Sequence, residues 1–323
     1  MIKSFFLDQK WLYWSYLGLT IIMLSIWFSV ELKIQLNTWT GDFYNLIQTA
    51  FTKPKTINSL TIYKSCLSFI LITLSYGILN EALSYFSKIY TFKWRTASNQ
   101  FYLQQWEKIN VVEGIAQRVH EDTARYAELI EILFQKIVKS ILILFMFLPI
   151  VISLGQNVLE IPILGTTENA ITKSCFFIVL LGSSLIAVSS KKIPQIEMNR
   201  QKQEAAYRKA LVYEENEIKI KNSSQLEKIY NLIQKCYYKI CQKYFFTNCI
   251  KELYIKFNYI MPYFVLTPTI LSGLITLGII KQIISAVSEV NDALACLIYA
   301  YQEIIEIIAI HLRLKEVDLL FSK

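Results

Sequence analysis

The chain has 323 residues, of which 54% are hydrophobic and only 18% are charged, and its mean hydropathy is +0.37. About a quarter of the residues in soluble globular domains are charged, so this composition excludes an ordinary soluble domain. Nine glycines and six prolines leave few interruptions, which favours long helices. The sequence therefore predicts an all-α membrane protein.

Six apolar stretches are predicted to cross the bilayer, because about 20 apolar residues are enough to span its core. They belong to a single transmembrane domain, 1–323, and their approximate bounds are 11–36, 62–88, 133–154, 172–192, 254–280 and 287–312. The fifth stretch contains Pro262, Pro268 and Gly273, and we expect it to be bent. Two long polar connections, 88–132 and 191–253, contain hardly any Gly or Pro and are predicted to be helical extensions into the cytoplasm.

The sixth stretch is more polar than the others, but its polar residues follow a helical period. At 100° per residue, six positions fall within an arc of about 100°. They are Glu289, Asp292, Cys296, Tyr299, Glu303 and Glu306. This acidic stripe is typical of a membrane helix with one face toward a water-filled cavity.

The basic residues predict the orientation. With both termini in the cytoplasm, the inside segments hold 27 Lys and Arg residues and the outside segments only six. The net charge of +8 is explained by this asymmetry, so the predicted partner is the lipid bilayer and no nucleic acid is invoked.

No pattern in the sequence predicts an enzyme. Six scattered cysteines have no zinc or disulfide spacing, and His120 and His311 are each isolated from a metal-ligating or nucleophilic partner. We therefore expect no metal, no cofactor and no covalent catalysis.

Six spans with long cytoplasmic extensions are the architecture of an ABC-exporter-like transmembrane domain, and this step is analogy of fold. Longer strings between Trp11 and Phe321 resemble the SbmA/BacA family of bacterial inner-membrane peptide transporters. These strings are LNTWTGDFYNLIQTA, FKWRTASNQFYLQQW, IAQRVHEDTARYAELIE, FLPIVISLG, EIPILG, QKQEAAYRKALVYEE and LTPTILSGLITLGIIKQI.

The resemblance implies a homodimer of ABC-exporter-like membrane domains without an ATPase. It implies import of peptides and peptide-like antibiotics across the bacterial inner membrane, driven by protons. The residues independently support one part of this: a Walker A loop needs Gly followed by Lys, and no glycine here precedes a lysine. Family members usually carry two further hydrophobic segments before the core, whereas here MIKSFF runs almost directly into WLYWSYLG.

Carboxylates are the candidate proton carriers, since burial in a medium of low dielectric favours their protonated form. The resemblance matches Glu131, Glu204 and Glu215 to family glutamates thought to act in proton coupling, and places Glu306 in a family-like string. Glu204 and Glu215 lie among lysines and arginines, so a solvated, ion-paired helix face is the alternative.

The remaining acidic positions are candidates for lining the cavity. Glu81, Glu289, Asp292 and Glu303, with Tyr299 in the same stripe, are expected to tune it for cationic peptides. Outside the membrane, Glu121 and Asp122 are expected to pair with Arg118 and Arg125 along one helix.

Three functions stay open from the sequence. The first is the proton-coupled peptide importer, and the second is the membrane subunit of an ABC transporter whose ATPase is a separate chain. The third is a truncated, inactive copy of such a transporter.

Overall fold

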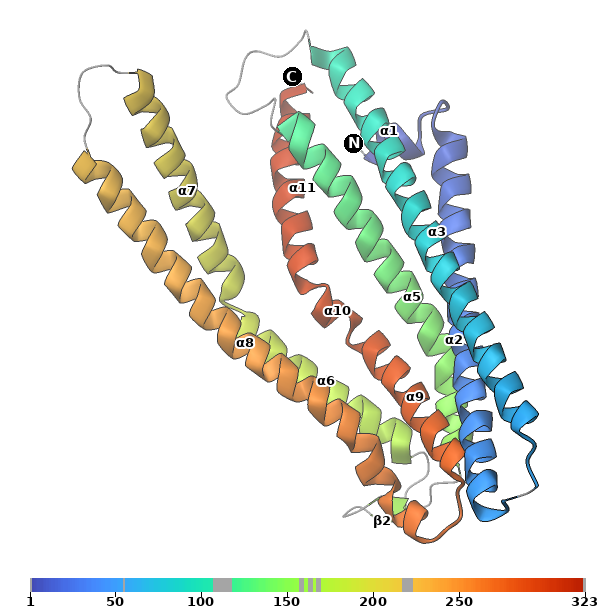
Figure 1. Cartoon of the computed structure of the whole chain (residues 1–323). Helices are drawn as coiled ribbons and strands as arrows, with labels where there is room; N and C mark the ends of the chain where they lie inside the picture. The colour runs from blue at the N-terminus through green and yellow to red at the C-terminus, as the bar shows by residue number, and fades with distance from the viewer. Residues whose placement is uncertain are drawn as a thin grey trace. The chain divides into compact units, whose positions relative to one another are not determined.

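The computed structural model describes residues 2–54, 56–106, 118–156, 160–161, 165–166, 170–216 and 223–321. Helices dominate this part of the chain (Figure 1). The sequence predicts one domain, and the structure groups the residues into two compact units. Unit 1 is Met1–Phe176 with Met261–Lys323, and unit 2 is Phe177–Ile260.

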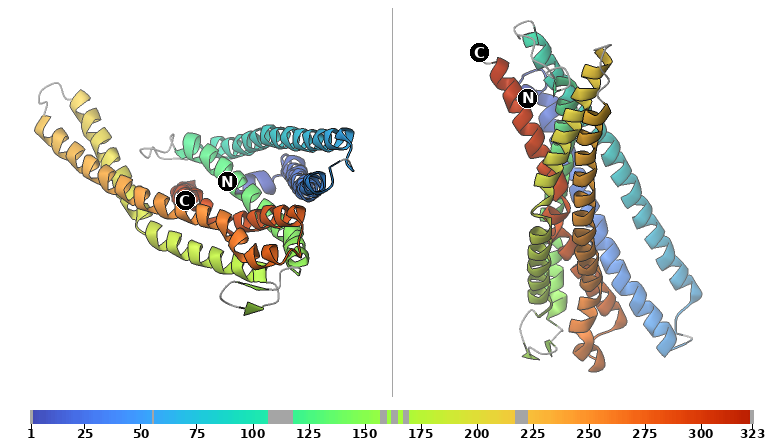
Figure 2. Two further views of the ribbon diagram at one scale, coloured as in Figure 1. Left: turned by 60° about the horizontal axis from the view of Figure 1, so that its bottom comes forward. Right: turned by 90° about the vertical axis from the view of Figure 1, so that its left-hand side faces the viewer.

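Unit 1 is built around three long helices that run side by side, α2 (Leu12–Thr52), α3 (Ser59–Gln105) and α5 (Thr123–Gly155) (Figures 1 and 2). A short helix, α1 (Ile2–Phe6), precedes them, and a single π-helical turn, η2 (Arg118–Asp122), leads into α5. Two strands of two residues each, β1 (Glu160–Ile161) and β2 (Gly165–Thr166), pair antiparallel after α5.

The C-terminal part of unit 1 consists of α9 (Leu277–Leu294), α10 (Cys296–Tyr299) and α11 (Tyr301–Phe321). The sequence predicts one helix over 287–312, and the structure interrupts it twice, at Ala295 and Ala300. The acidic stripe is therefore divided between three helices. α9 packs against α2 and α5, and α11 packs against α5.

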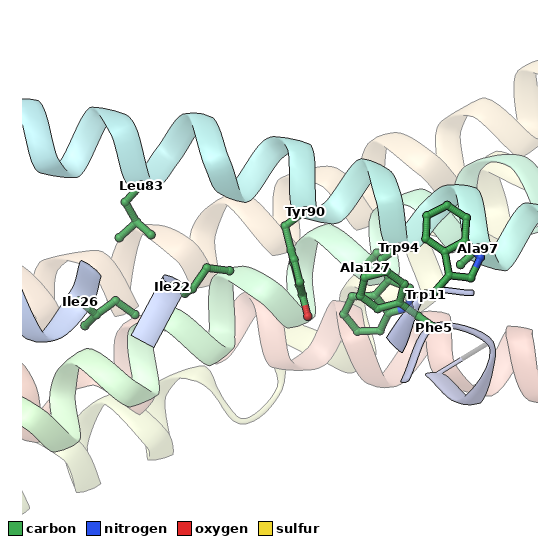
Figure 3. Close-up of a cluster of buried hydrophobic side chains, with 9 residues drawn as sticks. All are labelled: Phe5, Trp11, Ile22, Ile26, Leu83, Tyr90, Trp94, Ala97 and Ala127. Atoms are coloured by element: carbon green, nitrogen blue, oxygen red, sulfur yellow. The ribbon is translucent and has the colours of Figure 1, made fainter. Parts of the chain in front are cut away.

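Aromatic side chains join α1 to the long helices in the main apolar cluster (Figure 3). The Phe5 ring is wholly buried and stacks on Trp94 with centroids 5.7 Å apart, while its edge meets Tyr90 at 5.4 Å. The Tyr90 hydroxyl donates a hydrogen bond to the backbone oxygen of Ser15 at 3.1 Å. Burying large aromatic surfaces at the start of the chain fixes α1 against α3.

Unit 2 contains most of α6 (Ala170–Ser190), the whole of α7 (Ile193–Asn216) and most of α8 (Ser223–Leu271). The chain runs along α7 and returns in the opposite direction along α8 (Figure 1). Gly182 lets α6 approach α8 closely, because a Cβ atom there would lie 2.2 Å from the ring of Tyr254. The Tyr207 and Tyr230 rings meet further along, with centroids 5.7 Å apart.

Four helical stretches of the described chain are long and apolar enough to cross a membrane: Leu12–Thr52, Ser59–Gln104, Val119–Gly155 and Thr172–Val212. The chain thus has the helices of a membrane protein, while the count of six spans stays a prediction. The fifth predicted span is split because α8 ends at Leu271 and Gly273 adopts a positive φ of 69°. The sixth is split as described above.

α9 approaches α2 closely at the point where α9 begins. Gly278 faces Gly41 of α2, and a Cβ atom on Gly278 would lie 2.1 Å from the Gly41 carbonyl oxygen. Side chains of α2 accept hydrogen bonds from the first amides of α9: Gln48 from Leu277 at 2.8 Å and Asn45 from Gly278 at 3.0 Å. These acceptors satisfy amides that a helix start leaves without intrahelical partners.

We predict that Gly278→Ala lowers the free energy of unfolding by about 1–3 kcal/mol, the usual range for overpacking, because the methyl group collides with backbone. The midpoint of thermal unfolding in detergent measures this. Gly77→Ala in α3 is the matched control, since no atom lies within 4 Å of a Cβ atom there. Equal midpoints for the two variants would show that α2 and α9 do not pack in this way.

Candidate functional site

Glu131 is a nearly buried carboxylate in the middle of the α2–α3–α5 packing. The residue as a whole is only 6% exposed. Gln135, one turn further along α5, donates hydrogen bonds to the Glu131 carboxylate and to the Ser87 hydroxyl of α3. The amide thus links Glu131 to the neighbouring helix. A carboxylate so little exposed, in an apolar helix, is the type of group that marks proton or ion pathways.

A pocket with a volume of about 640 Å³ opens beside Glu131. Its walls come from α3 and α5, and α2 contributes Ile26 and Ser29. Six charged side chains line it: Lys88, Arg95, Glu128, Glu131, Lys136 and Lys139. The pocket therefore has two carboxylates and four cations, which is a basic wall around one buried acid.

Three of the four carboxylates in the acidic stripe are paired with cations of the same chain. Lys33 of α2 holds Glu289 at 2.5 Å, and Lys136 of α5 holds Glu303 at 2.5 Å. Both oxygens of Glu306 accept hydrogen bonds from Arg125, at 2.7 and 3.0 Å. We call these three contacts, together with the Asp122–Arg313 pair described next, the ion-pair ladder.

In the fourth contact of the ladder the C-terminal helix supplies the cation and its neighbour supplies the carboxylate. Arg313 of α11 donates two hydrogen bonds to Asp122 of η2, at 2.8 and 2.9 Å. These bonds raise the pKa of the Arg313 guanidinium above its ordinary value, so the pair stays charged. Beside it, the His311 ring stacks on Tyr126 and shares a 3.1 Å hydrogen bond with its hydroxyl.

This pairing corrects one expectation. The sequence predicts that Asp122 pairs with a neighbouring arginine along its own helix, and the structure pairs it with Arg313, 191 positions away. Arg125 does bind within α5, to Glu128 at 3.1 Å, but it also reaches Glu306. Contacts between distant helices replace the local ones because η2 and α5 run beside α11.

The other predicted residues are not gathered at the Glu131 pocket. Glu204 lies in unit 2 and pairs with Arg200, one turn before it on α7. Glu215 is in α7, and its side chain lies outside the described residues. Glu81 and Asp292 are exposed, and Tyr299 is half-buried in α10. Among the described members of this set, Glu131 is the one in the wall of the pocket.

Sequence reasoning missed the cations that face the stripe. Lys33 and Lys136 each fall inside a predicted span, where an isolated charge is costly and is usually paired. This cost could have indicated that Lys33 and Lys136 pair with the carboxylates of the acidic stripe, which lie on another predicted span. Gln135 gave no such signal, because an uncharged polar residue is common in a helix of this kind.

Comparison with known proteins gives two findings. The family model described as SbmA/BacA-like family matches residues 8–321. The chain is also similar to the inner membrane ABC transporter ATP-binding protein YddA of Escherichia coli (strain K12), with 24% identity over 325 residues. The alignment covers 94% of this chain and 56% of that relative, so the chain spans little more than half of the relative's length.

We predict that reversing either charge of the Lys136–Glu303 pair destabilises the protein, and that reversing both restores it. Lys136→Glu or Glu303→Lys alone sets like charges together and should cost about 1–3 kcal/mol, the range for a hydrogen bond to a charged group. Thermal unfolding of the two single variants and the double variant forms the test cycle. If the loss of unfolding free energy in the double variant equals the sum of the losses in the two single variants, the two side chains do not interact.

Proposed function

Because the chain belongs to the SbmA/BacA-like family, we propose that it is a bacterial inner-membrane transporter that imports peptides and peptide-like antibiotics together with protons. The observation that carries the proton coupling is Glu131, a carboxylate 6% exposed in the wall of a pocket between apolar helices. A carboxylate enclosed by apolar helices is the kind of group that lies on proton pathways in membrane proteins.

Protonation of Glu131 changes the charge of the pocket wall by one unit. In the ionised form the carboxylate accepts the hydrogen bond of the Gln135 amide, which also holds Ser87. In the neutral form one carboxyl oxygen carries a proton and donates while the other still accepts, so the group offers its neighbours a different set of hydrogen bonds. The two protonation states therefore favour different α3–α5 contacts, which is what a carrier needs to link a proton to a change of shape.

The other proposed proton carriers rank below Glu131. Glu306 accepts two hydrogen bonds from Arg125, and Glu204 is paired with Arg200. Both carboxylates are thus engaged in charged hydrogen bonds to a guanidinium group, whereas the partner of Glu131 is an uncharged amide. Glu215 keeps its place among the candidates by the resemblance alone. Glu81, Glu289, Asp292, Tyr299 and Glu303 remain candidates for the cavity wall.

The assembly and orientation belong to the same proposal. Two copies would form a homodimer of ABC-exporter-like membrane domains, with six spans in each copy. Both termini would lie in the cytoplasm, because the predicted inside segments hold 27 of the 33 basic residues.

A second function has its own observation. The relative from Escherichia coli is named an ATP-binding protein of an ABC transporter, and the chain covers 56% of its length. The chain would then be the membrane part of a transporter whose ATPase lies outside these 323 residues. Dependence of uptake on ATP distinguishes this function from the proton-coupled one.

We predict that Glu131→Gln abolishes peptide uptake, because an amide keeps the shape of the carboxyl group but cannot release a proton. Uptake of a labelled proline-rich peptide into cells lacking their own carrier measures this, with membrane content of the variant checked in parallel. Glu227→Gln, at an exposed position of α8, is the matched control and should transport normally. A protonophore should stop peptide uptake by the unmodified protein. Uptake that survives the protonophore, or the Glu131 substitution, would contradict proton coupling.

We also predict that the purified protein is a dimer in mild detergent. The proposed fold is built from two such halves, and a closed two-fold assembly is the commonest arrangement of identical chains. Native mass spectrometry over a range of protein concentrations measures the state. Monomer alone at every concentration would speak against the homodimer.

A further inference from the structure

The charges of the Glu131 pocket do not match a purely cationic cargo. Of its four cations, Lys136 is bound to Glu303, and the Lys139 ammonium lies 5.9 Å from the centre of the Tyr76 ring. Of its two carboxylates, Glu128 is bound to Arg125. The charged groups that remain are Lys88, Arg95 and the buried Glu131, so the pocket keeps an excess of positive charge.

Lys88 and Arg95 lie on one face of α3. They are seven residues apart, which is two turns and about 10 Å along the helix. No carboxylate among the described residues forms an ion pair with either side chain, and the contact found for Arg95 is with the His120 ring nitrogen at 3.4 Å. Two cations in a pocket wall without acidic partners from the described chain form a binding surface for an anion.

The pocket is long enough for an extended chain. From Asn80 to Arg95 its α3 wall spans fifteen helical steps, about 22 Å, which is the length of about six or seven residues of extended peptide. The wall contains both polar and apolar side chains. Ser84, Thr91 and Gln135 offer hydrogen bonds to a peptide backbone, and Leu83, Phe92 and Ile132 offer apolar contact.

We infer that this pocket binds the C-terminal carboxylate of an extended peptide, with Lys88 and Arg95 receiving the negative charge. The inference rests on the proposed peptide transport and names the group by which the cargo is recognised. Guanidinium and ammonium groups form their strongest hydrogen bonds with such an anion. For the cationic side chains of a peptide the pocket keeps one carboxylate, the nearly buried Glu131, because Glu289, Glu303 and Glu306 are already bound in the ion-pair ladder.

The test compares peptides that differ only at the C terminus. A fluorescent hexapeptide with a free carboxylate, its C-terminal amide, and the amide with a glutamate as last residue are titrated onto the purified full-length protein in lipid nanodiscs. The free acid should bind about tenfold more tightly than either amide, the factor expected for one charged hydrogen bond. Lys88→Gln and Arg95→Gln should each remove this preference.

Lys93→Gln is the matched control. Lys93 lies on the same helix between the two cations but is absent from the pocket wall, and its ammonium lies 5.2 Å from the centre of the Trp14 ring. This variant should keep the preference for the acid. Thermal unfolding of each variant checks that the fold is intact.

Equal affinity for acid and amide, or a preference that persists when Lys88 and Arg95 are both replaced, would overturn the inference. Tight binding of the glutamate-ended amide would also overturn it, because the site would then accept a side-chain carboxylate as well as a C-terminal one. These measurements need no proton gradient, so they leave the Glu131 result untouched. Absence of binding by all three peptides would instead contradict peptide transport itself.

Discussion

The arrangement of unit 1 depends on pairing charges between helices that are otherwise apolar. The ion-pair ladder joins α9, α11 and η2 to their neighbours through Lys33–Glu289, Lys136–Glu303, Arg125–Glu306 and Asp122–Arg313. Lys33–Glu289 and Lys136–Glu303 lie within the predicted spans, where a charge without a partner is costly, while Asp122, Arg125 and Arg313 lie beyond the spans. Because the partners come from different helices, the pairs also set the register of α11 against α5.

This constraint explains why the C-terminal helices tolerate two interruptions. The apolar contact between α5 and α11 is a small cluster around Tyr126, Leu129, Ile310 and Leu314. Ala295 and Ala300 interrupt the helix, yet Glu289 before them and Glu303 after them are both bound to cations. The interruptions thus separate segments that are each fixed by an ion pair. At the other end, α9 is fixed by Gly278 against Gly41.

Composition and periodicity were enough to predict a helical membrane protein and the acidic stripe, whereas Glu131 was singled out by the resemblance and its role stays a prediction. They were not enough for the interruptions at Ala295 and Ala300, because alanine is a good helix former and neither position has a Gly or Pro signal. The break at Gly273 did have such a signal. The partners of the stripe could not be assigned, since a period of 3.6 shows which residues share a face but not which helix lies opposite.

The same limit applies to the pocket. Arg95 and Glu131 fall 36 positions apart in one predicted connection, 88–132, and Lys88 lies at its boundary with the second predicted span, so no spacing in the sequence links the three. Only the packing of α3 against α5 brings them to one wall, where the Gln135 amide connects Glu131 to Ser87. A site of this kind depends on tertiary contacts, so the sequence pointed to Glu131 as a candidate but not to Lys88, Arg95 or Gln135.

Lys136 belongs both to the Glu131 pocket and to the ion-pair ladder. It lines the pocket beside Glu131, and its ammonium group holds Glu303 of α11. A change of charge in the pocket, whether a proton on Glu131 or a bound anion, acts on Lys136 through the same low-dielectric surroundings. An added anion competes with Glu303 for this cation, and loss of the Glu131 charge leaves Glu303 as its stronger partner. Under the proposed function, Lys136 is therefore the side chain through which a change of charge in the pocket would reach the contact between α11 and α5.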